Sequence, residues 1–304
     1  KNTTQARPQG PPAMRKRRPR RCRWLVAVGT CAALDVGRRQ MVLPSLLLGA
    51  VQEPQTKDET TERTERQSLV ARRMAKAPRE LRRPEYGLDA PDIVYPAVFR
   101  GDWAAESTCL GVAAPLGAPL FGGETAYAAA QQDVGDTLRY DVRFLANGIA
   151  DRPFNTRSLV AATLADDDAL AALPSSDAFD PNNLKFKLTL GGAAYAASLR
   201  MLGRYVSSAS SRLFETSEFV RQSVSREGGL SAALSLEPAS VKDIETLCSF
   251  TVVDDDTIAC DQRTATWLFA SDQLSAAKVA AADGRPVDVR RYRLVYRRRR
   301  MHES

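Results

Sequence analysis

The chain has 304 residues and a formal net charge of +7, but this charge is unevenly distributed. Residues 1–50 hold eleven of the 43 Lys and Arg and one of the 36 acidic residues, which leaves 32 basic and 35 acidic residues for 51–304. A basic surface would favour nucleic acid or an anionic membrane, so the slightly acidic remainder argues against a nucleic-acid-binding domain. No run approaches the roughly 20 apolar residues of a membrane-spanning helix, and we expect the protein not to be transmembrane.

Residues 1–52 are predicted to be a disordered targeting leader. The segment 14–33 is rich in arginine and has no acidic residue, as is typical of organelle transit peptides. Arg38-Arg39 then precede the short apolar run 41–51, which is the arrangement of a twin-arginine signal. A transit peptide followed by such a signal resembles a thylakoid lumen precursor, so we expect the chloroplast thylakoid lumen, with the stroma as the alternative. A disordered basic N-terminus with a chance arginine pair is the other interpretation.

Residues 53–83 are dense in Glu, Thr, Arg and Lys and contain few large apolar side chains. This composition predicts a charged linker or a solvated helix rather than core. The segment 84–297 is long enough for one domain with a sizeable core. The closing cluster of arginines, Arg290 to Arg300, is expected to be a solvated strand end that leads into a basic tail at 298–304, with a binding patch as the alternative.

The stretch Val94–Gly123 holds the most informative aromatic residues. Pro96 and Gly101 frame Phe99 and Trp103, and an extended segment then runs to Val112, before a Pro- and Gly-rich turn region. A large ring at the start of the first strand can plug one end of a rolled sheet, with its N–H reaching a backbone acceptor. The alternative is that both rings are ordinary core aromatics.

The clearest strand is Leu138–Phe144, which alternates strictly between apolar and charged residues. Leu138, Tyr140, Val142 and Phe144 share one face, and Arg139, Asp141 and Arg143 share the other. This period predicts a half-buried strand. The Ala- and Leu-rich piece Ser158–Leu173, ended by Pro174, is the predicted helix.

The remaining strands are expected at 154–160, 184–190, 214–224 and 287–296, with 195–205 as strand-like or irregular. Two β-rich runs, 244–253 and 257–270, are joined by Asp254-Asp255-Asp256 and predict a hairpin. About eight strands with one short helix and no β-α-β alternation predict a mainly β fold. An antiparallel barrel is the simplest arrangement, because closure removes the exposed edges of the sheet.

The single histidine, His302, lies in the basic tail. A serine or cysteine nucleophile in the domain therefore has no histidine base, and a histidine-containing zinc site has no ligands there. The sequence has no Cys-x-x-Cys and no Walker loop, and no Gly-x-Gly-x-x-Gly placed between a predicted strand and a helix. We expect no metal and no cofactor, and we favour a function other than catalysis. Acid–base chemistry by Glu106, Asp141 or Asp151 stays open, although each of them fits a solvated surface charge better.

Cys248 and Cys260 flank the acidic turn. If the hairpin centres on Asp254, the two thiols lie directly across from each other and a disulfide is predicted, as an oxidising lumen would allow. A one-residue slip would place them on opposite faces, and two ordinary buried thiols are the alternative. Cys109 is expected to pack as a small apolar residue.

Several segments resemble a domain of unknown function shared by cyanobacterial and plastid proteins. They span 84–297 and include Tyr95-Pro96 with Phe99–Trp103, Ala114–Gly117, Ala150–Thr156, Phe214–Gln222, Gln262–Thr266 and Gly284–Val287. This resemblance implies a plastid or cyanobacterial setting. It supplies no catalytic residue.

A looser resemblance is to lipocalin-like (calycin-type) barrels, whose first strand begins with a Gly-x-Trp motif, here Gly101-Asp102-Trp103. It implies that an arginine of the last strand stacks over the tryptophan, with Arg291 or Arg293 as candidates. Plastid lipid-associated proteins, which have similar short strand patterns, are a competing comparison.

The first hypothesis for function is a non-enzymatic thylakoid lumen protein that binds a lipid, pigment or quinone inside the barrel. Trp103, Tyr140, Val142 and Phe144 are its candidate ligand-binding residues. The second is an assembly or stability factor for a photosynthetic membrane complex, with an exposed apolar patch at Leu116, Leu120 and Phe121. The third is a carboxylate-dependent enzyme.

Overall fold

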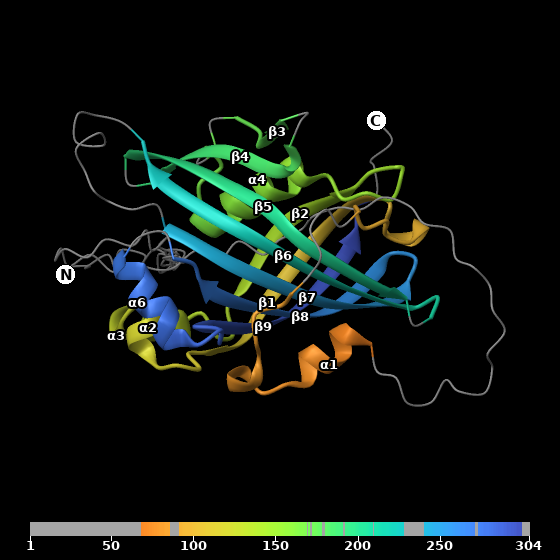
Figure 1. Cartoon of the computed structure of the whole chain (residues 1–304). Helices are drawn as coiled ribbons and strands as arrows, with labels where there is room; N and C mark the ends of the chain where they lie inside the picture. Colours follow the sequence, from red (N-terminus) through yellow and green to blue (C-terminus); the bar gives the residue numbers. More distant parts are fainter. Residues whose placement is uncertain are drawn as a thin grey trace, which may run out of the picture.

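A computed structural model describes residues 68–85, 91–168, 170, 172–177, 180–190, 192–208, 210–227, 240–270 and 273–299. The predicted leader, the first part of the predicted linker and most of the basic tail lie outside the described residues. The strands are β1 (Gly101–Ala113), β2 (Thr137–Phe144), β3 (Ser175–Asp177), β4 (Asp180–Leu190), β5 (Ala193–Ser208), β6 (Leu213–Arg226), β7 (Ser240–Asp254), β8 (Thr257–Leu268) and β9 (Asp288–Arg298) (Figure 1). The helices are α1 (Leu69–Ala75), α2 (Ala118–Phe121), α3 (Glu124–Gln131), α4 (Arg152–Leu164) and α6 (Gln273–Ala282), with short 3-10 turns η1 (Pro78–Glu80) and η2 (Ala97–Phe99).

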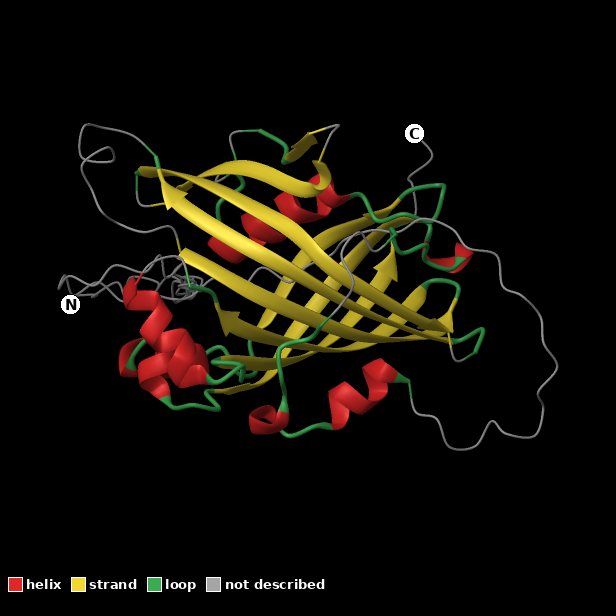
Figure 2. Ribbon diagram, in the orientation of Figure 1, coloured by secondary structure: helices red, strands yellow, loops and turns green. Residues whose placement is uncertain are grey.

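The nine strands in the described part of the chain form one sheet in the order β2-β1-β9-β8-β7-β6-β5-β4-β3. Every neighbouring pair is antiparallel. The prediction of a mainly β, antiparallel fold is therefore confirmed. The prediction of a closed barrel is wrong, because β2 and β3 stand at opposite ends of the strand order. The sheet is nonetheless strongly curled, and Figure 2 shows β1 and β2 lying behind the strands β4 to β6.

Helix α4 lies against the open edge of β2, where a barrel would have its closing strand pair. The side chain of Asn155 accepts from the backbone N–H of Arg143 at 2.7 Å and donates to the carbonyl of the same residue at 3.1 Å. Ser158 accepts from the N–H of Asp141 at 2.7 Å. Two helix side chains thus satisfy edge groups that would otherwise need a strand partner.

The bounds of α4 correct the sequence-based expectation of a strand at 154–160 and a helix at 158–173. Asp151 caps the helix by accepting from the N–H of Phe154 at 3.1 Å, and Pro153 lies in the first turn. The prediction of one short helix is also wrong, since α1, α2, α3 and α6 accompany α4. The expected turn region after Val112 contains α2.

The largest apolar cluster fills the concave face of the curled sheet. It draws side chains from β1, β2 and β4 to β9, and Leu159 and Val160 of α4 join it. Tyr140, Val142 and Phe144 of β2 are at most 6% exposed, which confirms the face predicted from their alternation. Burial of this face is the main stabilising term of such a fold.

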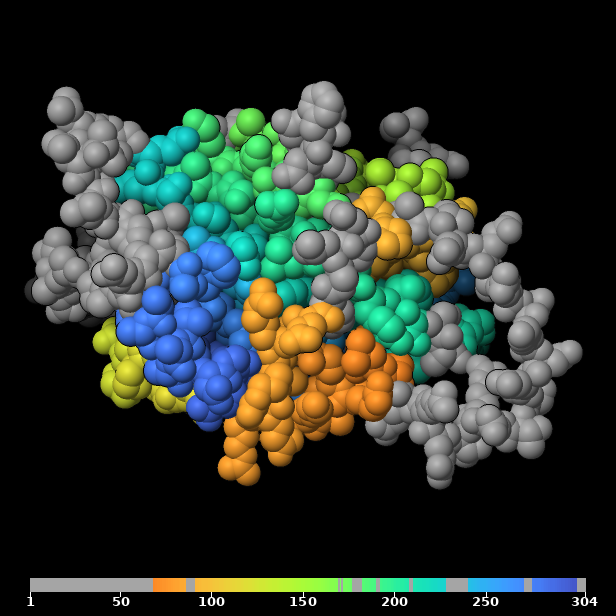
Figure 3. All heavy atoms as spheres, in the orientation of Figure 1, coloured from red at the N-terminus to blue at the C-terminus, as the bar shows by residue number. Residues whose placement is uncertain are grey.

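The segment 68–85 packs across the convex face of β6 to β8, as Figure 3 shows for the orange chain. Leu81 is fully buried with Phe219 and Trp267. Arg73 pairs with Glu245 at 2.6 Å and Arg83 pairs with Asp243 at 2.7 Å. From Ser68 onward, the chain forms the helix α1, one of the two forms expected, but Val70 and Leu81 are buried, so this part is packed on the sheet rather than solvated.

The hairpin β7–β8 with its acidic turn is confirmed, but its register is displaced from the expected one. Phe250 faces Cys260 and Cys248 faces Gln262, with an irregularity between Val252 and Asp254. Cys248 and Cys260 thus share the concave face as diagonal neighbours, and both are buried free thiols. The register therefore does not give the directly opposed pair on which the predicted disulfide depends. Cys109 is buried as expected.

Candidate functional site

Trp103 closes the end of the concave face at which β1 begins. Its ring is fully buried, and its indole N–H donates to the carbonyl oxygen of Phe99 at 2.6 Å. The turn η2 places this carbonyl just before the strand. The prediction of a buried indole with a backbone acceptor is therefore confirmed.

Arg298 of β9 covers the indole, with its guanidinium carbon 4.3 Å from the ring centroid. It donates to the carbonyl oxygens of Val98 and Arg100 at 2.6 and 2.7 Å, and to that of Asp255 at 2.9 Å. One cation thereby ties the η2 turn and the β7–β8 turn to the last strand. A cation over an indole face is attracted by the ring quadrupole.

The expectation that Arg291 or Arg293 covers the indole is wrong. Both side chains have the opposite parity to Arg298 along β9, and Arg293 forms an exposed pair with Asp261 at 3.2 Å. Gly101, the glycine of the Gly-x-Trp motif, opens β1. Its φ of +106° lies in a region that favours glycine, and a β-carbon there would lie 3.4 Å from the guanidinium of Arg298.

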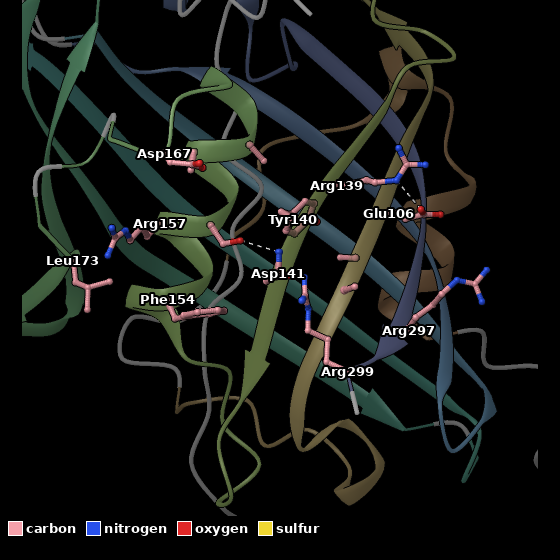
Figure 4. A pocket seen from close by; sticks show the side chains of 15 residues that line it. Glu106, Arg139, Tyr140, Asp141, Phe154, Arg157, Asp167, Leu173, Arg297 and Arg299 are labelled. Carbon is pink, nitrogen blue, oxygen red and sulfur yellow. Dashed lines mark hydrogen bonds and ion pairs between the residues drawn. The ribbon is translucent and has the colours of Figure 1, made fainter. Parts of the chain in front are cut away.

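A groove of about 730 Å³ lies between α4 and the outer face of β1 and β2. Figure 4 shows Tyr140 and Asp141 of β2 between the α4 side chains on one side and, on the other, Arg297 of β9 and Arg299, which follows the strand. Its lining residues are Ala104, Ala105, Glu106, Arg139, Tyr140, Asp141, Phe154, Arg157, Ser158, Ala161, Ala162, Asp167, Leu173, Arg297 and Arg299. Its volume falls within the roughly 300–1,000 Å³ of small-molecule sites.

The floor of the groove is apolar or small where α4 faces it. Ala161 and Ala162 leave room along the helix, and Phe154 lies under the guanidinium of Arg143 at 4.1 Å. Leu173 is 54% exposed beside them. An apolar molecule could cover this surface.

Four arginines border the groove, and they differ in their partners. Arg139 pairs with Glu106 at 2.7 Å and Arg299 pairs with Asp141. Arg157 and Arg297 form no ion pair within the part of the chain that the structure describes. The groove therefore offers two cationic groups that no carboxylate neutralises by contact.

Two of the three carboxylates considered for acid–base chemistry lie in the groove. Glu106 and Asp141 both line the groove, but each is held by an arginine, whereas Asp151 caps α4. The hydrogen bond from Arg139 lowers the pKa of the Glu106 carboxyl below its ordinary 4.5. A general acid needs a raised pKa, so this arrangement does not suit Glu106 for that role. Within the described residues, no three His, Cys, Asp or Glu side chains are grouped to hold a metal ion.

The sequence of residues 87–300 matches the model of DUF6816, a domain of unknown function. The chain belongs to the DUF6816 family. Neither a curated protein nor a solved structure matches it. The helix α1 and the turn η1 precede the matched DUF6816 region, although they pack on its sheet.

The other residues singled out from the sequence are placed as follows in this DUF6816 domain. The four candidate ligand-binding residues, Trp103, Tyr140, Val142 and Phe144, lie together in the concave core, and Tyr140 also lines the groove. Phe121, expected in an exposed patch, is buried against α3, while Leu116 and Leu120 are half-buried. No described helix has the length and apolar character needed to cross a membrane. Sequence reasoning missed the groove, because it depends on where α4 docks.

Proposed function

We propose that this protein is a non-enzymatic binding protein for an apolar small molecule that carries an acidic group. The bound molecule lies in the groove between α4 and the outer face of β1 and β2. A lipid, pigment or quinone with a carboxylate or phosphate has this chemistry. The observation that carries the proposal is the combination of an apolar floor with two arginines, Arg157 and Arg297, that lack an ion-pair partner in the described chain.

The choice of the groove over the concave face follows from packing at the Trp103 end. There, Tyr95, Phe99, Phe144, Phe214 and Phe250 fill the space between the strands. Ring centroids lie 4.7 Å apart for Tyr95 and Phe144, and 5.3 Å apart for Phe99 and Phe250. Interiors packed at this density leave little room for a ligand.

We also propose a lipocalin-like relationship and a plastid setting. The Gly101–Trp103 opening with a last-strand arginine over the indole supports the relationship, although the sheet is open. The arginine-rich leader and its twin arginine support the thylakoid lumen as the location. Import of residues 1–67 fused to a reporter protein into isolated chloroplasts tests the location, and retention of the fused reporter outside the thylakoids would contradict it.

The binding proposal is tested with a fluorescent long-chain fatty acid and its methyl ester, titrated into the full chain. The acid should bind and the ester should bind more weakly, because only the acid can form charge-assisted hydrogen bonds with the arginines. Replacing Arg157 and Arg297 by Gln should weaken binding of the acid by about tenfold for each lost contact.

The matched control is Arg293→Gln, which removes an exposed arginine of the same strand, β9, from outside the groove. It should leave binding of the acid unchanged. Equal affinities for acid and ester, or equal losses in the control and the groove variants, would contradict the proposal.

A further inference from the structure

Two buried arginines from distant elements meet at one carboxylate oxygen. Arg152 begins α4 and Arg204 lies in β5. Nη2 of Arg152 lies 2.9 Å from Oδ1 of Asp92, and Nη1 of Arg204 lies 2.8 Å from the same oxygen. The two guanidinium groups therefore converge on one point, which we call the two-arginine site.

The arginines of this site lie inside the protein, whereas the carboxylate reaches them from the surface. The side chains of Arg152 and Arg204 are 8% and 2% exposed, and that of Asp92 is 36% exposed. Burial lowers the pKa of Arg152, and the nearby charge of Arg204 lowers it further. Because two buried cations repel each other, they need an anion between them.

The sheet and α4 hold the two arginines in place. Nη2 of Arg204 donates to Oδ1 of Asn182 in β4 at 3.3 Å, and its Nε lies 3.7 Å from Oε1 of Glu218 in β6. Arg152 belongs to the buried face of α4. Asp92, by contrast, lies between the turns η1 and η2, outside the helices and strands. The cationic part of the site is thus fixed by regular elements, while the anion comes from a connecting segment.

The site opens onto the concave face of the sheet. Glu218 lies four residues from Phe214 along β6, and Phe214 belongs to the concave cluster. Arg204 is the register partner of Glu218. Further along the same face, Arg290 lies four residues from Leu294 of this cluster. The concave face therefore carries buried charge beyond the aromatic rings of the Trp103 end.

We propose that the two-arginine site binds a small monocarboxylate, and that Asp92 occupies the site when no ligand is bound. The carboxylate of Asp92 stands where the acid group of the ligand would lie. A guanidinium presents its N–H donors in a planar fork that fits a carboxylate. Neither Arg152 nor Arg204 lines the groove between α4 and β2, so this site does not depend on the function proposed there.

The charges around the site favour a monoanion. Exchange of the Asp92 carboxylate for another monocarboxylate leaves the net charge of the site unchanged. A dianion such as sulfate would add a negative charge near Glu218, which is 3% exposed, and a buried excess charge is costly. We therefore expect the site to prefer acetate over sulfate.

The first test is chemical rescue of Asp92→Ala in the full chain. This variant leaves the two buried guanidiniums without their shared anion and should lower the Tm by about 5–10 °C. Sodium acetate should restore most of the lost Tm in a saturable way, whereas sodium chloride and sodium sulfate at equal ionic strength should not. If the variant does not fold, the yield of refolding in acetate and in chloride makes the same comparison. Acetate no better than chloride would overturn the proposal.

The matched control is Asp102→Ala. Asp102 is 39% exposed, close to the exposure of Asp92, but it pairs with Arg143, which is 40% exposed. Its loss should lower the Tm by less, and acetate should restore no more of the Tm than chloride does. An equal response to acetate in both variants would show a general effect of the salt, against the proposal.

A double variant tests whether the arginines hold the acetate. In Asp92→Ala/Arg152→Gln, one cation leaves together with the anion, so the Tm should lie above that of Asp92→Ala. The response to acetate should fall about tenfold or disappear. An undiminished response would place the acetate elsewhere and contradict the proposal.

Binding to the wild-type protein tests whether a ligand displaces Asp92. Saturation-transfer NMR on the methyl group of acetate should detect binding to the full chain, about tenfold weaker than binding to Asp92→Ala because Asp92 competes for the site. Acetate that binds Asp92→Ala but not the wild type would show that Asp92 is a permanent structural partner, which would overturn the proposal.

Discussion

The two ends of the concave face are built on opposite principles. Around Trp103, each polar atom of the indole and of Arg298 has a partner, and the rings pack against one another. Around Arg290, charged side chains are buried in contact with one another: Nε of Arg290 lies 3.0 Å from Asp288, and Nη1 lies 3.7 Å from Asp133. The first end has the character of a stabilising core. The second end buries ion pairs, whose desolvation cost offsets much of their attraction.

The comparison of the two ends is tested first at Trp103, where we expect the largest change in the free energy of unfolding. Trp103→Ala removes a fully buried indole and should lower the free energy of unfolding by about 3–5 kcal/mol. Urea denaturation followed by circular dichroism measures the change. A loss below about 1 kcal/mol, typical of a surface position, would mean that this end is not the stabilising one.

The buried charges around Arg290 give the next largest effect. Arg290→Met removes the guanidinium that contacts the buried carboxylates of Asp288 and Asp133 and should cost about 3 kcal/mol. Adding Asp288→Leu should recover much of this loss, because a buried ion pair contributes little over apolar residues of similar size. Urea unfolding of the single and double variants measures both values. A double variant less stable than Arg290→Met would mean that the pair itself stabilises the sheet.

The smallest effect is expected for the exposed ion pair of Glu106 and Arg139, which provides a comparison with the buried charges around Arg290. The hydrogen bond from Arg139 lowers the pKa of Glu106 below 4.5, so the pair makes its full contribution to folding stability above that pH. This contribution to stability is lost as the pH falls through the lowered pKa of Glu106. Arg139→Gln should return the pKa of Glu106 to about its ordinary value. A carbon-detected NMR titration of the carboxyl measures it, and an unchanged pKa would contradict the contact.

Short sequence patterns, such as the alternation of apolar and polar residues, predicted those parts of the fold that depend on residues close together in the sequence. The face of β2 that carries Tyr140, the hairpin around Asp254–Asp256 and the buried Trp103 all follow from short patterns. Arg298 could also have been found, since it has the parity of the buried Tyr296, whereas Arg291 and Arg293 do not.

The features that sequence reasoning missed depend on contacts between distant segments or on local irregularities. The apolar run that begins at Phe154 suits a strand as well as a helix, and the cap at Asp151 with Pro153 was the overlooked signal. The turn is centred between Asp255 and Asp256 rather than on Asp254, because Asp254 pairs with Thr257, and this places Cys260 out of line with Cys248. That five buried polar residues are successive register partners becomes apparent only when the register of five strands is known; they are Arg204, Glu218, Thr246, Thr264 and Arg290.

The most direct measurement of the proposed binding function is native mass spectrometry of the full chain purified from the cells that make it. The wild-type protein should carry an apolar, acidic small molecule, and Ala161→Trp, which fills the groove from α4, should carry none. A wild-type protein without a bound molecule, or equal loading of both proteins, would contradict the proposal.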